Sequence, residues 1–182
     1  MKAVFLDRDG TINIDKGYVH KIEDFEYLPG ALEGLELLQK KEYVLFFVTN
    51  QSGIARGLYT EEQYKELEEW MIKDLQMKGI EIEKVFYCPH HPQAVREEYR
   101  VECNCRKPNV GLFLKAAEEY QICLDEAILI GDRWRDLELC RETQARGFLL
   151  YCKEERQVNN VFMIKGGILE AANIIVSGGA NE

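Results

Sequence analysis

The stretch AVFLDRDGT, residues 3–11, joins a short apolar run to a group of charged and polar side chains. Its first part, AVFLD, has the length and composition of a buried strand that ends in a carboxylate. The run VLFFVTN (44–50) is also continuously apolar up to its polar end, as expected for a strand covered on both faces. Because such strands need helices on both sides of their sheet, these two runs predict an α/β fold.

Segments of helical period alternate with further strand-like runs along the rest of the chain. Helices are predicted at 30–41, from Thr60 as N-cap to Gly79, at 111–121, and after residue 132 to about residue 145. Strands are predicted at 84–88, 127–132 and 147–152, and the tail adds a strand at 161–164, a helix at 166–176 and a frayed end at 177–182. This alternation predicts one domain, residues 1–182, built as a doubly wound, Rossmann-like parallel sheet with right-handed crossovers.

The composition argues against several classes of protein. Hydrophobic residues make up 46% and charged residues 30% of the 182-residue chain, which is typical of a soluble globular protein. The net charge of −9 argues against a nucleic-acid or membrane-surface binder, and no apolar run approaches the roughly 20 residues of a transmembrane helix. Charged residues interrupt the N-terminus before a signal-peptide core forms, so we expect a cytoplasmic protein whose six cysteines stay reduced.

Polar side chains gather where the predicted strands end. They are Asp7, Arg8 and Asp9 after the first strand, Thr49 to Ser52 at the second, Arg106 and Lys107 beyond the third, and Asp132 and Arg133 after the fourth. Ligands of open parallel sheets bind outside the carboxyl ends of the strands, so these residues are predicted to share one site. The alternative, polar residues that only terminate strands, explains one such group more easily than four.

These residue types fit phosphoryl transfer. Asp7 and Asp9, two positions apart, lie on the same side of the strand end, so one can attack phosphorus while the other handles the leaving-group proton. A carboxylate from another strand, Asp132, completes the oxygen ligands that Mg²⁺ prefers. The Thr49 hydroxyl and the Lys107 ammonium can hold the phosphoryl oxygens as negative charge gathers on them.

The motifs FLDRDGT, VTN and LIGD, with a lysine before a helix, resemble the haloacid dehalogenase superfamily of aspartate-nucleophile phosphatases. The resemblance implies Asp7 as the nucleophile that forms an aspartyl phosphate, and Asp9 as acid and then base. It also implies Mg²⁺ held by the carboxylates of Asp7 and Asp132 and by the backbone carbonyl of Asp9. No insertion long enough for a large cap domain is present, and residues 10–22 are predicted to form only a small flap over an open site.

Longer blocks, from residue 3 to about residue 150, resemble the heptose bisphosphate phosphatases within that superfamily. The implied activity is removal of the 7-phosphate of a heptose 1,7-bisphosphate, in the synthesis of nucleotide-activated heptose for lipopolysaccharide or another surface glycan. The resemblance implies that Arg106 recognises the phosphate that stays and Lys107 the one that leaves. The implied substrate-binding residues are Asp15, Lys16, Gly17, Tyr18, Thr49, Asn50, Gln51, Ser52, Arg106, Lys107 and Arg133. Arg133 departs from the family, which usually has lysine there, and arginine is bulkier and forks its donors.

Cys88, His90, Cys103 and Cys105 form two close pairs of soft ligands, as a closed structural zinc site requires. The gaps are tighter than the common two-residue spacing, and the family resemblance implies a zinc loop over residues 88–105. The family pattern favours His90 over its neighbour His91. The alternative is a disulfide between Cys88 and Cys103 or Cys105. The segment has no Cys-x-x-Cys motif, which argues against a redox centre. Four protein ligands leave no open position for water, which argues against catalytic zinc.

Three other functions stay open from the sequence. Histidinol-phosphate phosphatases carry a similar Cys/His loop, although their ligand pairs lie closer together than Cys88 and Cys103. A catalytically silent binding module on the same fold is opposed by the presence together of Asp7, Asp9, Thr49, Lys107 and Asp132. A phosphotransferase would need a lid against water, which the sequence does not indicate. The expected protein is thus a monomeric phosphatase for a small sugar phosphate, with no nucleic-acid or membrane partner.

Overall fold

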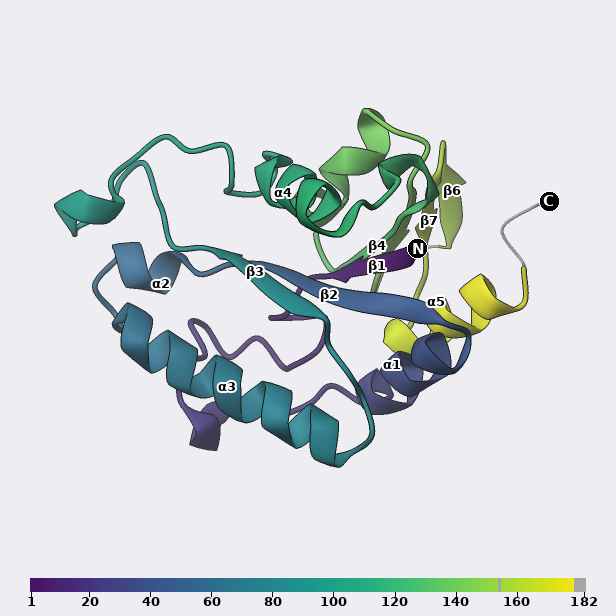
Figure 1. Ribbon diagram of the computed structural model, residues 1–182, viewed down its shortest axis with the longest axis horizontal. Helices are drawn as coiled ribbons and strands as arrows, with labels where there is room; N and C mark the ends of the chain where they lie inside the picture. Colours follow the sequence, from purple (N-terminus) through teal and green to yellow (C-terminus); the bar gives the residue numbers. More distant parts are fainter. Residues whose placement is uncertain (154, 179–182) are drawn as a thin grey trace.

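The computed structural model describes residues 1–153 and 155–178, which fold around a single twisted sheet (Figure 1). The strands are β1 (Lys2–Leu6), β2 (Tyr43–Asn50), β3 (Lys84–Cys88), β4 (Ile128–Gly131), β5 (Arg146–Leu149), β6 (Arg156–Val158) and β7 (Val161–Met163). They lie in the order β3-β2-β1-β4-β5-β7-β6. Every neighbouring pair is parallel except β6 with β7. The predicted doubly wound sheet is therefore confirmed, with β1 between β2 and β4.

Helices cover both faces of this sheet, as the continuously apolar strands require. The α-helices are α1 (Ala31–Lys40), α2 (Ser52–Ala55), α3 (Glu61–Met77), α4 (Gly111–Tyr120) and α5 (Ile168–Val176). Short 3-10 helices are η1 (Ile22–Asp24), η2 (Glu97–Tyr99), η3 (Leu124–Glu126) and η4 (Trp134–Arg141). In Figure 1, α1, α3 and α5 lie below the sheet and α4 lies above it.

The side chains of β1 show how the two layers are held. Val4 and Leu6 pack into the core under α1, α3 and α5, whereas Ala3 and Phe5 pack into the core under α4 and η4. This alternation follows from the two-residue period of a strand. Gly34 lets α1 approach α5, since a Cβ atom there would lie 2.5 Å from Ile168 Cγ2.

Two segments differ from the sequence-based expectation. The helix expected after β4 is the 3-10 helix η4, which ends at Arg141 rather than near residue 145, because the Thr143 hydroxyl donates to the Leu139 carbonyl and the chain turns there toward β5. The strand β6 was not predicted; it pairs antiparallel with β7 at the sheet edge. Of the tail expected to fray, residues 179–182 lie outside the described residues.

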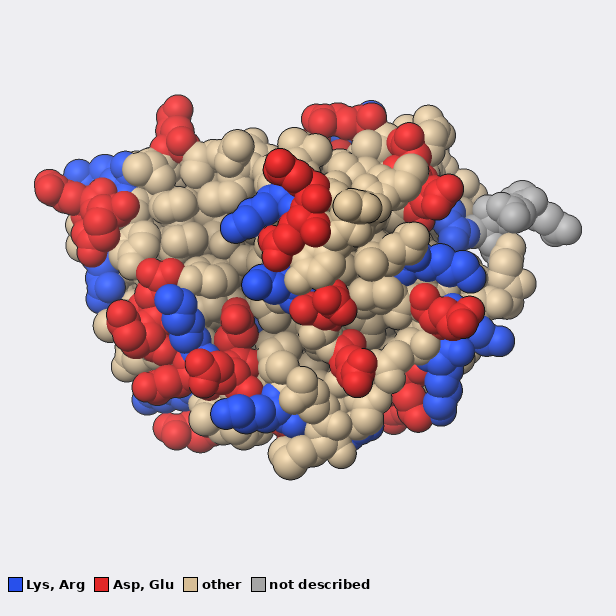
Figure 2. Space-filling model, viewed as in Figure 1, with Lys and Arg blue, Asp and Glu red and all other residues tan. Residues whose placement is uncertain are grey.

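The acidic surplus lies largely on exposed helix faces. Figure 2 shows acidic side chains gathered over α3, where Glu62, Glu66 and Glu69 are exposed. The opposite face of the same helix buries Tyr64, Leu67, Met71 and Leu75. No helix in the described part of the chain is both long and apolar enough to cross a membrane.

Candidate active site

The carboxyl ends of three adjacent strands meet at one edge of the sheet and bring the predicted catalytic residues together. Asp7 follows β1, Thr49 lies near the end of β2, and Asp132 follows β4. Lys107 reaches the same point from the loop between β3 and α4, with its Nζ 2.7 Å from Asp7 Oδ1 and 2.6 Å from the Val48 carbonyl oxygen. Residues one hundred positions apart in the chain are thus joined in one buried cluster.

The cluster contains two carboxylates for one ammonium group. Lys107 Nζ is also 2.7 Å from Asp136 Oδ1, and all three side chains are at most 6% exposed. Burial and, after it, the charge of Asp136 raise the pKa of Asp7 to about 7, against the opposing effect of Lys107. Burial alone would lower the pKa of Lys107, but the charges of Asp7 and Asp136 outweigh it and raise that pKa.

The surplus negative charge makes this cluster a fitting cation site. Carboxylate oxygens of Asp7, Asp132 and Asp136 all lie within 4.8 Å of one another. Asp132 Oδ1 is buried and has no hydrogen-bond partner among the described residues. Burial, and then the charge of Asp136, raises the pKa of Asp132. Since Mg²⁺ prefers hard oxygen ligands, these carboxylates fit it.

Asp136 is the member of this cluster that the predicted metal set lacked. It extends from η4, where its carboxylate also accepts a hydrogen bond from the Arg133 backbone nitrogen. Its contact with Lys107 also makes Asp136 a support for that lysine. The role of the Asp9 backbone carbonyl as a metal ligand stays a prediction.

The Asp9 carboxylate is held by three side chains. Arg8 Nη2 lies 2.8 Å from each Asp9 oxygen, Asn13 Nδ2 donates to Oδ1 at 3.0 Å and Gln51 Nε2 donates to Oδ2 at 3.1 Å. Arg8 is 1% exposed and its Nη2 also donates to the Val19 carbonyl. The sequence analysis placed Arg8 among the polar residues at the end of the first strand but assigned it no role, although an arginine between two catalytic aspartates was a signal.

Residues 10–22 return over the site as the small flap that was predicted. Gly10 begins it with a φ of +84°, and a Cβ atom there would lie 2.6 Å from Asp132 Oδ2, so only glycine fits. Near the end of the flap, the His20 ring stacks on Tyr59 with the centroids 4.6 Å apart. The Tyr59 hydroxyl donates to Gln51 Oε1, which links the flap contact to the side chains around Asp9.

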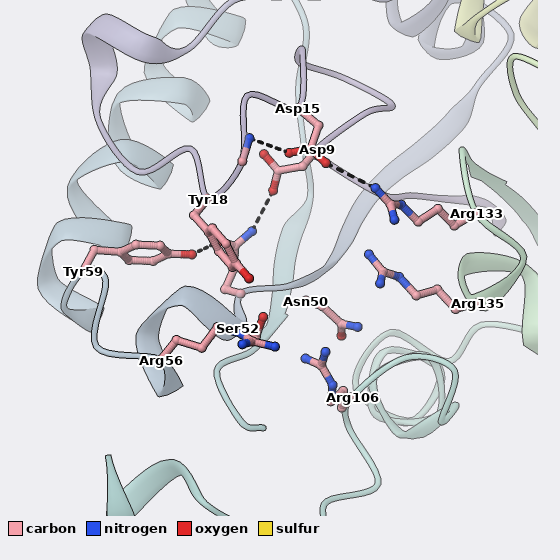
Figure 3. Close-up of a pocket in the computed structure, with 12 residues that line it drawn as sticks. Asp9, Asp15, Tyr18, Asn50, Ser52, Arg56, Tyr59, Arg106, Arg133 and Arg135 are labelled. Atoms are coloured by element: carbon pink, nitrogen blue, oxygen red, sulfur yellow. Dashed lines mark hydrogen bonds and ion pairs between the residues drawn. The ribbon is translucent and has the colours of Figure 1, made fainter. Parts of the chain in front are cut away.

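A cleft of about 320 Å³ opens beside Asp9 (Figure 3). Its lining includes most of the predicted substrate-binding residues, namely Asp15, Gly17, Tyr18, Asn50, Gln51, Ser52, Arg106 and Arg133. Thr49 and Lys107 are buried and do not belong to the lining, and Lys16 pairs with Glu26 at 3.1 Å instead. Tyr59, Arg135 and Arg56 also line the cleft, although they were not among the predicted substrate-binding residues.

Asn50 has a positioning role that its place in the cleft lining does not suggest. Its side-chain Nδ2 donates to the Lys107 carbonyl oxygen, and the Lys107 backbone nitrogen donates to Asn50 Oδ1, both at 3.0 Å. This reciprocal pair fixes the backbone from which Lys107 reaches Asp7.

The predicted zinc ligands converge in the loop after β3. Cys88 Sγ lies 3.6 Å from Cys103 Sγ and 3.1 Å from Cys105 Sγ, and His90 Nδ1 lies 3.3 Å from Cys105 Sγ. Two thiolates bound to one zinc at about 2.3 Å would be separated by roughly 3.8 Å, so the four donors fit such an ion. Cys88, Cys103 and Cys105 are free thiols, and the Nε2 of His91 faces Arg56 instead of the cluster.

Comparison with known proteins agrees with this geometry. The family described as polynucleotide kinase 3 phosphatase matches residues 2–136. A D-glycero-beta-D-manno-heptose-1,7-bisphosphate 7-phosphatase from Photorhabdus laumondii is 50% identical over 136 residues, 75% of this chain and 72% of that protein. The chain belongs to this family of heptose bisphosphate phosphatases. An Escherichia coli K12 protein of the same name is 46% identical over 136 residues, 75% of this chain and 71% of that protein.

The fold is that of the haloacid dehalogenase phosphatases, as the predicted resemblance implies, because solved structures of that type share it. The D,D-heptose 1.7-bisphosphate phosphatase from B. bronchiseptica, solved with magnesium and phosphate, has a TM-score of 0.84 at 26% identity. The matched region covers 98% of this chain and 99% of that one. The chain is therefore a hydrolase of phosphate monoesters, and the expectation that it has no large cap agrees with the small flap over its cleft.

Proposed function

We propose that this enzyme removes the 7-phosphate of D-glycero-β-D-manno-heptose 1,7-bisphosphate, in the synthesis of nucleotide-activated heptose. The observation that carries the proposal is the buried Asp7–Lys107 pair beside a cleft that four arginines line. The pair supplies a nucleophile with its cation, and the cleft supplies donors for a second phosphate. Relatives that are 46–50% identical carry the name of this activity.

Asp7 begins the reaction by attacking the phosphorus of the 7-phosphate. A bond forms between a carboxylate oxygen and phosphorus, while the bond from phosphorus to the sugar oxygen breaks. Asp9 gives its proton to the departing sugar oxygen and then takes a proton from the water that attacks the aspartyl phosphate. Phosphate leaves, and both carboxylates return to their starting states.

Lys107 and the carboxylates around it stabilise the negative charge that develops on the phosphoryl group. Lys107 holds Asp7 Oδ1 and offers its positive charge to the phosphoryl oxygens. Thr49 can add a hydroxyl hydrogen bond, although its oxygen currently accepts from Gln51 Nε2 at 2.9 Å. Asp7, Asp132 and Asp136 would hold Mg²⁺, which supplies Lewis-acid neutralisation of the phosphoryl group when bound.

A phosphate-release screen with Mg²⁺ tests the substrate. Both anomers of the heptose 1,7-bisphosphate, histidinol phosphate and a short oligonucleotide with a 3′-phosphate cover the main candidates, the last because of the matched family's description. The β-anomer is expected to give the highest kcat/KM and to leave the sugar 1-phosphate as product. A preference for histidinol phosphate or for the oligonucleotide would overturn the proposal.

Asp7→Asn tests the nucleophile directly. The amide is a poor nucleophile, so we expect kcat to fall by at least about 10³-fold while the circular dichroism spectrum stays native. Asp125→Asn is the matched control, because this carboxylate lies in η3 and accepts from the Gln144 backbone nitrogen outside the cleft. Undiminished phosphate release by Asp7→Asn would remove Asp7 from the nucleophile's role.

We further propose that Cys88, His90, Cys103 and Cys105 bind a structural Zn²⁺. Burial, and then the hydrogen bond with Cys105, raises the pKa of the Cys88 thiol, so a thiolate there needs a cation. Four protein ligands would leave no open position for water, which keeps this ion out of the chemistry. Zinc content near one equivalent in protein purified without chelators is the expected result.

The remaining expectations concern the setting of the enzyme. We propose that it acts as a monomer in the cytoplasm on a small sugar phosphate, without a nucleic-acid or membrane partner. The net charge of −9 supports the absence of polyanionic partners. Light scattering should give a mass near 21.1 kDa, and a doubled mass would contradict the monomer.

A further inference from the structure

Four guanidinium groups converge on the cleft in a chain whose net charge is −9. They belong to Arg56, Arg106, Arg133 and Arg135, which come from the end of α2, the loop before α4 and the segment after β4 (Figure 3). Arg133 is partly neutralised, since its Nη2 lies 3.4 Å from Asp15 Oδ2 and its Nε 3.5 Å from Asp132 Oδ2. The other three differ from it in this respect.

Arg56 and Arg106 have neutral hydrogen-bond partners. Arg106 Nη1 donates to the His90 carbonyl oxygen at 3.3 Å, and Arg56 Nη2 lies 3.1 Å from the His91 ring. Because a guanidinium can only donate, the His91 Nε2 accepts this hydrogen bond. Both guanidinium groups therefore keep their full charge for a ligand.

Arg135 adds a third charge of this kind. Its Nε is buried and has no hydrogen-bond partner within residues 1–153 and 155–178. The nearest carboxylate oxygen, Asp136 Oδ1, is 4.0 Å away and lies 2.7 Å from Lys107 Nζ, so it already has a cation. In Figure 3 the Arg135 side chain extends into the cleft between Arg133 and Arg106.

The three arginines also repel one another. All three guanidinium groups line one cleft of about 320 Å³, so their like charges lie close together. A cleft in which these three groups have no carboxylate of their own gains stability when an anion enters. A phosphate monoester presents three non-bridging oxygens and about two negative charges, and guanidinium groups bind such oxygens in paired hydrogen bonds.

We propose that Arg135 is a specificity-determining residue, which binds the phosphate that the substrate retains together with Arg56 and Arg106. This inference rests on the proposed function, because Asp7 and Lys107 take the phosphate that leaves. Arg135 selects a sugar bisphosphate over a monophosphate of the same sugar. A neutral or acidic residue at this position leaves the chemical step in place and weakens that selection.

The test compares two substrates, the heptose 1,7-bisphosphate and the heptose 7-phosphate. We expect Arg135→Ala to lower the ratio of their kcat/KM values by roughly tenfold, mainly through a higher KM for the bisphosphate. Arg135→Lys should recover part of the ratio, because lysine restores the positive charge but not the paired donors of a guanidinium group. Arg141→Ala is the matched control, since Arg141 pairs with Glu138 and lies outside this cleft.

The outcomes separate the two proposals. An unchanged ratio in Arg135→Ala, with the wild-type enzyme active on the bisphosphate, overturns the role of Arg135 and leaves the proposed function standing. An equal loss on both substrates overturns it as well, because Arg135 would then act on folding or on the Lys107–Asp136 pair. A wild-type enzyme that does not hydrolyse the bisphosphate overturns the proposed function itself.

Discussion

Arg8 shows how one buried side chain can organise an active site without touching substrate. It lies between the two aspartates of the motif and donates to the Asp9 carboxylate from Nε and Nη2. Its guanidinium also lies 5.8 Å from the centroid of the Tyr64 ring. Arg8 therefore fixes the direction in which Asp9 can exchange a proton, and it is a positioning residue.

Arg8→Lys is expected to lower kcat roughly tenfold and to change KM little. A lysine keeps the charge but cannot reach both Asp9 oxygens and the Val19 carbonyl from one planar group. Steady-state kinetics and the pH dependence of kcat measure this. If the Asp9 carboxylate is held less firmly, the limb of the pH profile that depends on the general acid should shift. A higher KM at unchanged kcat would mean that Arg8 serves substrate binding instead.

At the scale of elements, the loop from Cys88 to Cys105 depends on its four ligands because it has little core of its own. Ala94 is the one buried apolar side chain in the described chain between Pro89 and Cys105. The loop leads directly into Arg106 and Lys107, so its order decides where these two cations lie.

Cys103→Ser should therefore lose zinc, lower the Tm by roughly 5 °C or more and reduce kcat/KM, although the altered side chain is not catalytic. Cys123→Ser is the control, since Cys123 is exposed and lies outside the cluster. Metal analysis, thermal unfolding and phosphate release measure the three effects. Full activity in a zinc-free Cys103→Ser variant would show that the ligands do not position Lys107.

The N-terminus of α3 offers a separate test of local stability. Thr60 Oγ1 accepts from the Gln63 backbone nitrogen at 3.2 Å, and Gln63 Oε1 accepts from the Thr60 backbone nitrogen at 2.9 Å. Thr60→Ala is expected to lower the free energy of unfolding by about 1 kcal/mol in urea titrations, whereas Thr60→Ser keeps most of it. Equal stability of the two variants would argue against the cap.

At the scale of the whole molecule, the sequence predicted what local pattern determines. Apolar period and turn residues located the central strands, and the parallel-sheet rule brought Asp7, Thr49 and Asp132 to one edge. The sequence pattern could not place Arg135 or Tyr59 in the cleft, because their positions depend on how η4 and the loop after α2 pack. The strand β6 escaped prediction for a similar reason, since a three-residue edge strand has too short a pattern to recognise.

The stability of the metal-free molecule should depend on pH through the buried cluster of Asp7, Lys107 and Asp136. The pKa of Asp7 is about 7 in the fold and near 3.8 when the chain is unfolded, so between these values the folded state binds more protons. The free energy of unfolding therefore falls as pH rises from about 4 to 7, by roughly 1 kcal/mol per pH unit. Asp132, whose pKa is also raised, acts in the same direction.

Urea titrations in a chelator at several pH values between 4.5 and 8 measure this loss, with Asp7→Asn as the comparison. Groups elsewhere whose pKa is lowered, such as Glu61 and Asp74, affect both proteins equally and cancel in the difference. Asp7→Asn should gain stability relative to wild type as pH rises to 7 and keep a constant advantage above it. Added Mg²⁺ should restore the wild-type protein and leave Asp7→Asn nearly unchanged, because the excess carboxylate charge that destabilises the fold is the charge that binds the cation. Parallel stability curves for the two proteins in chelator would show that Asp7 titrates alike in the folded and unfolded states.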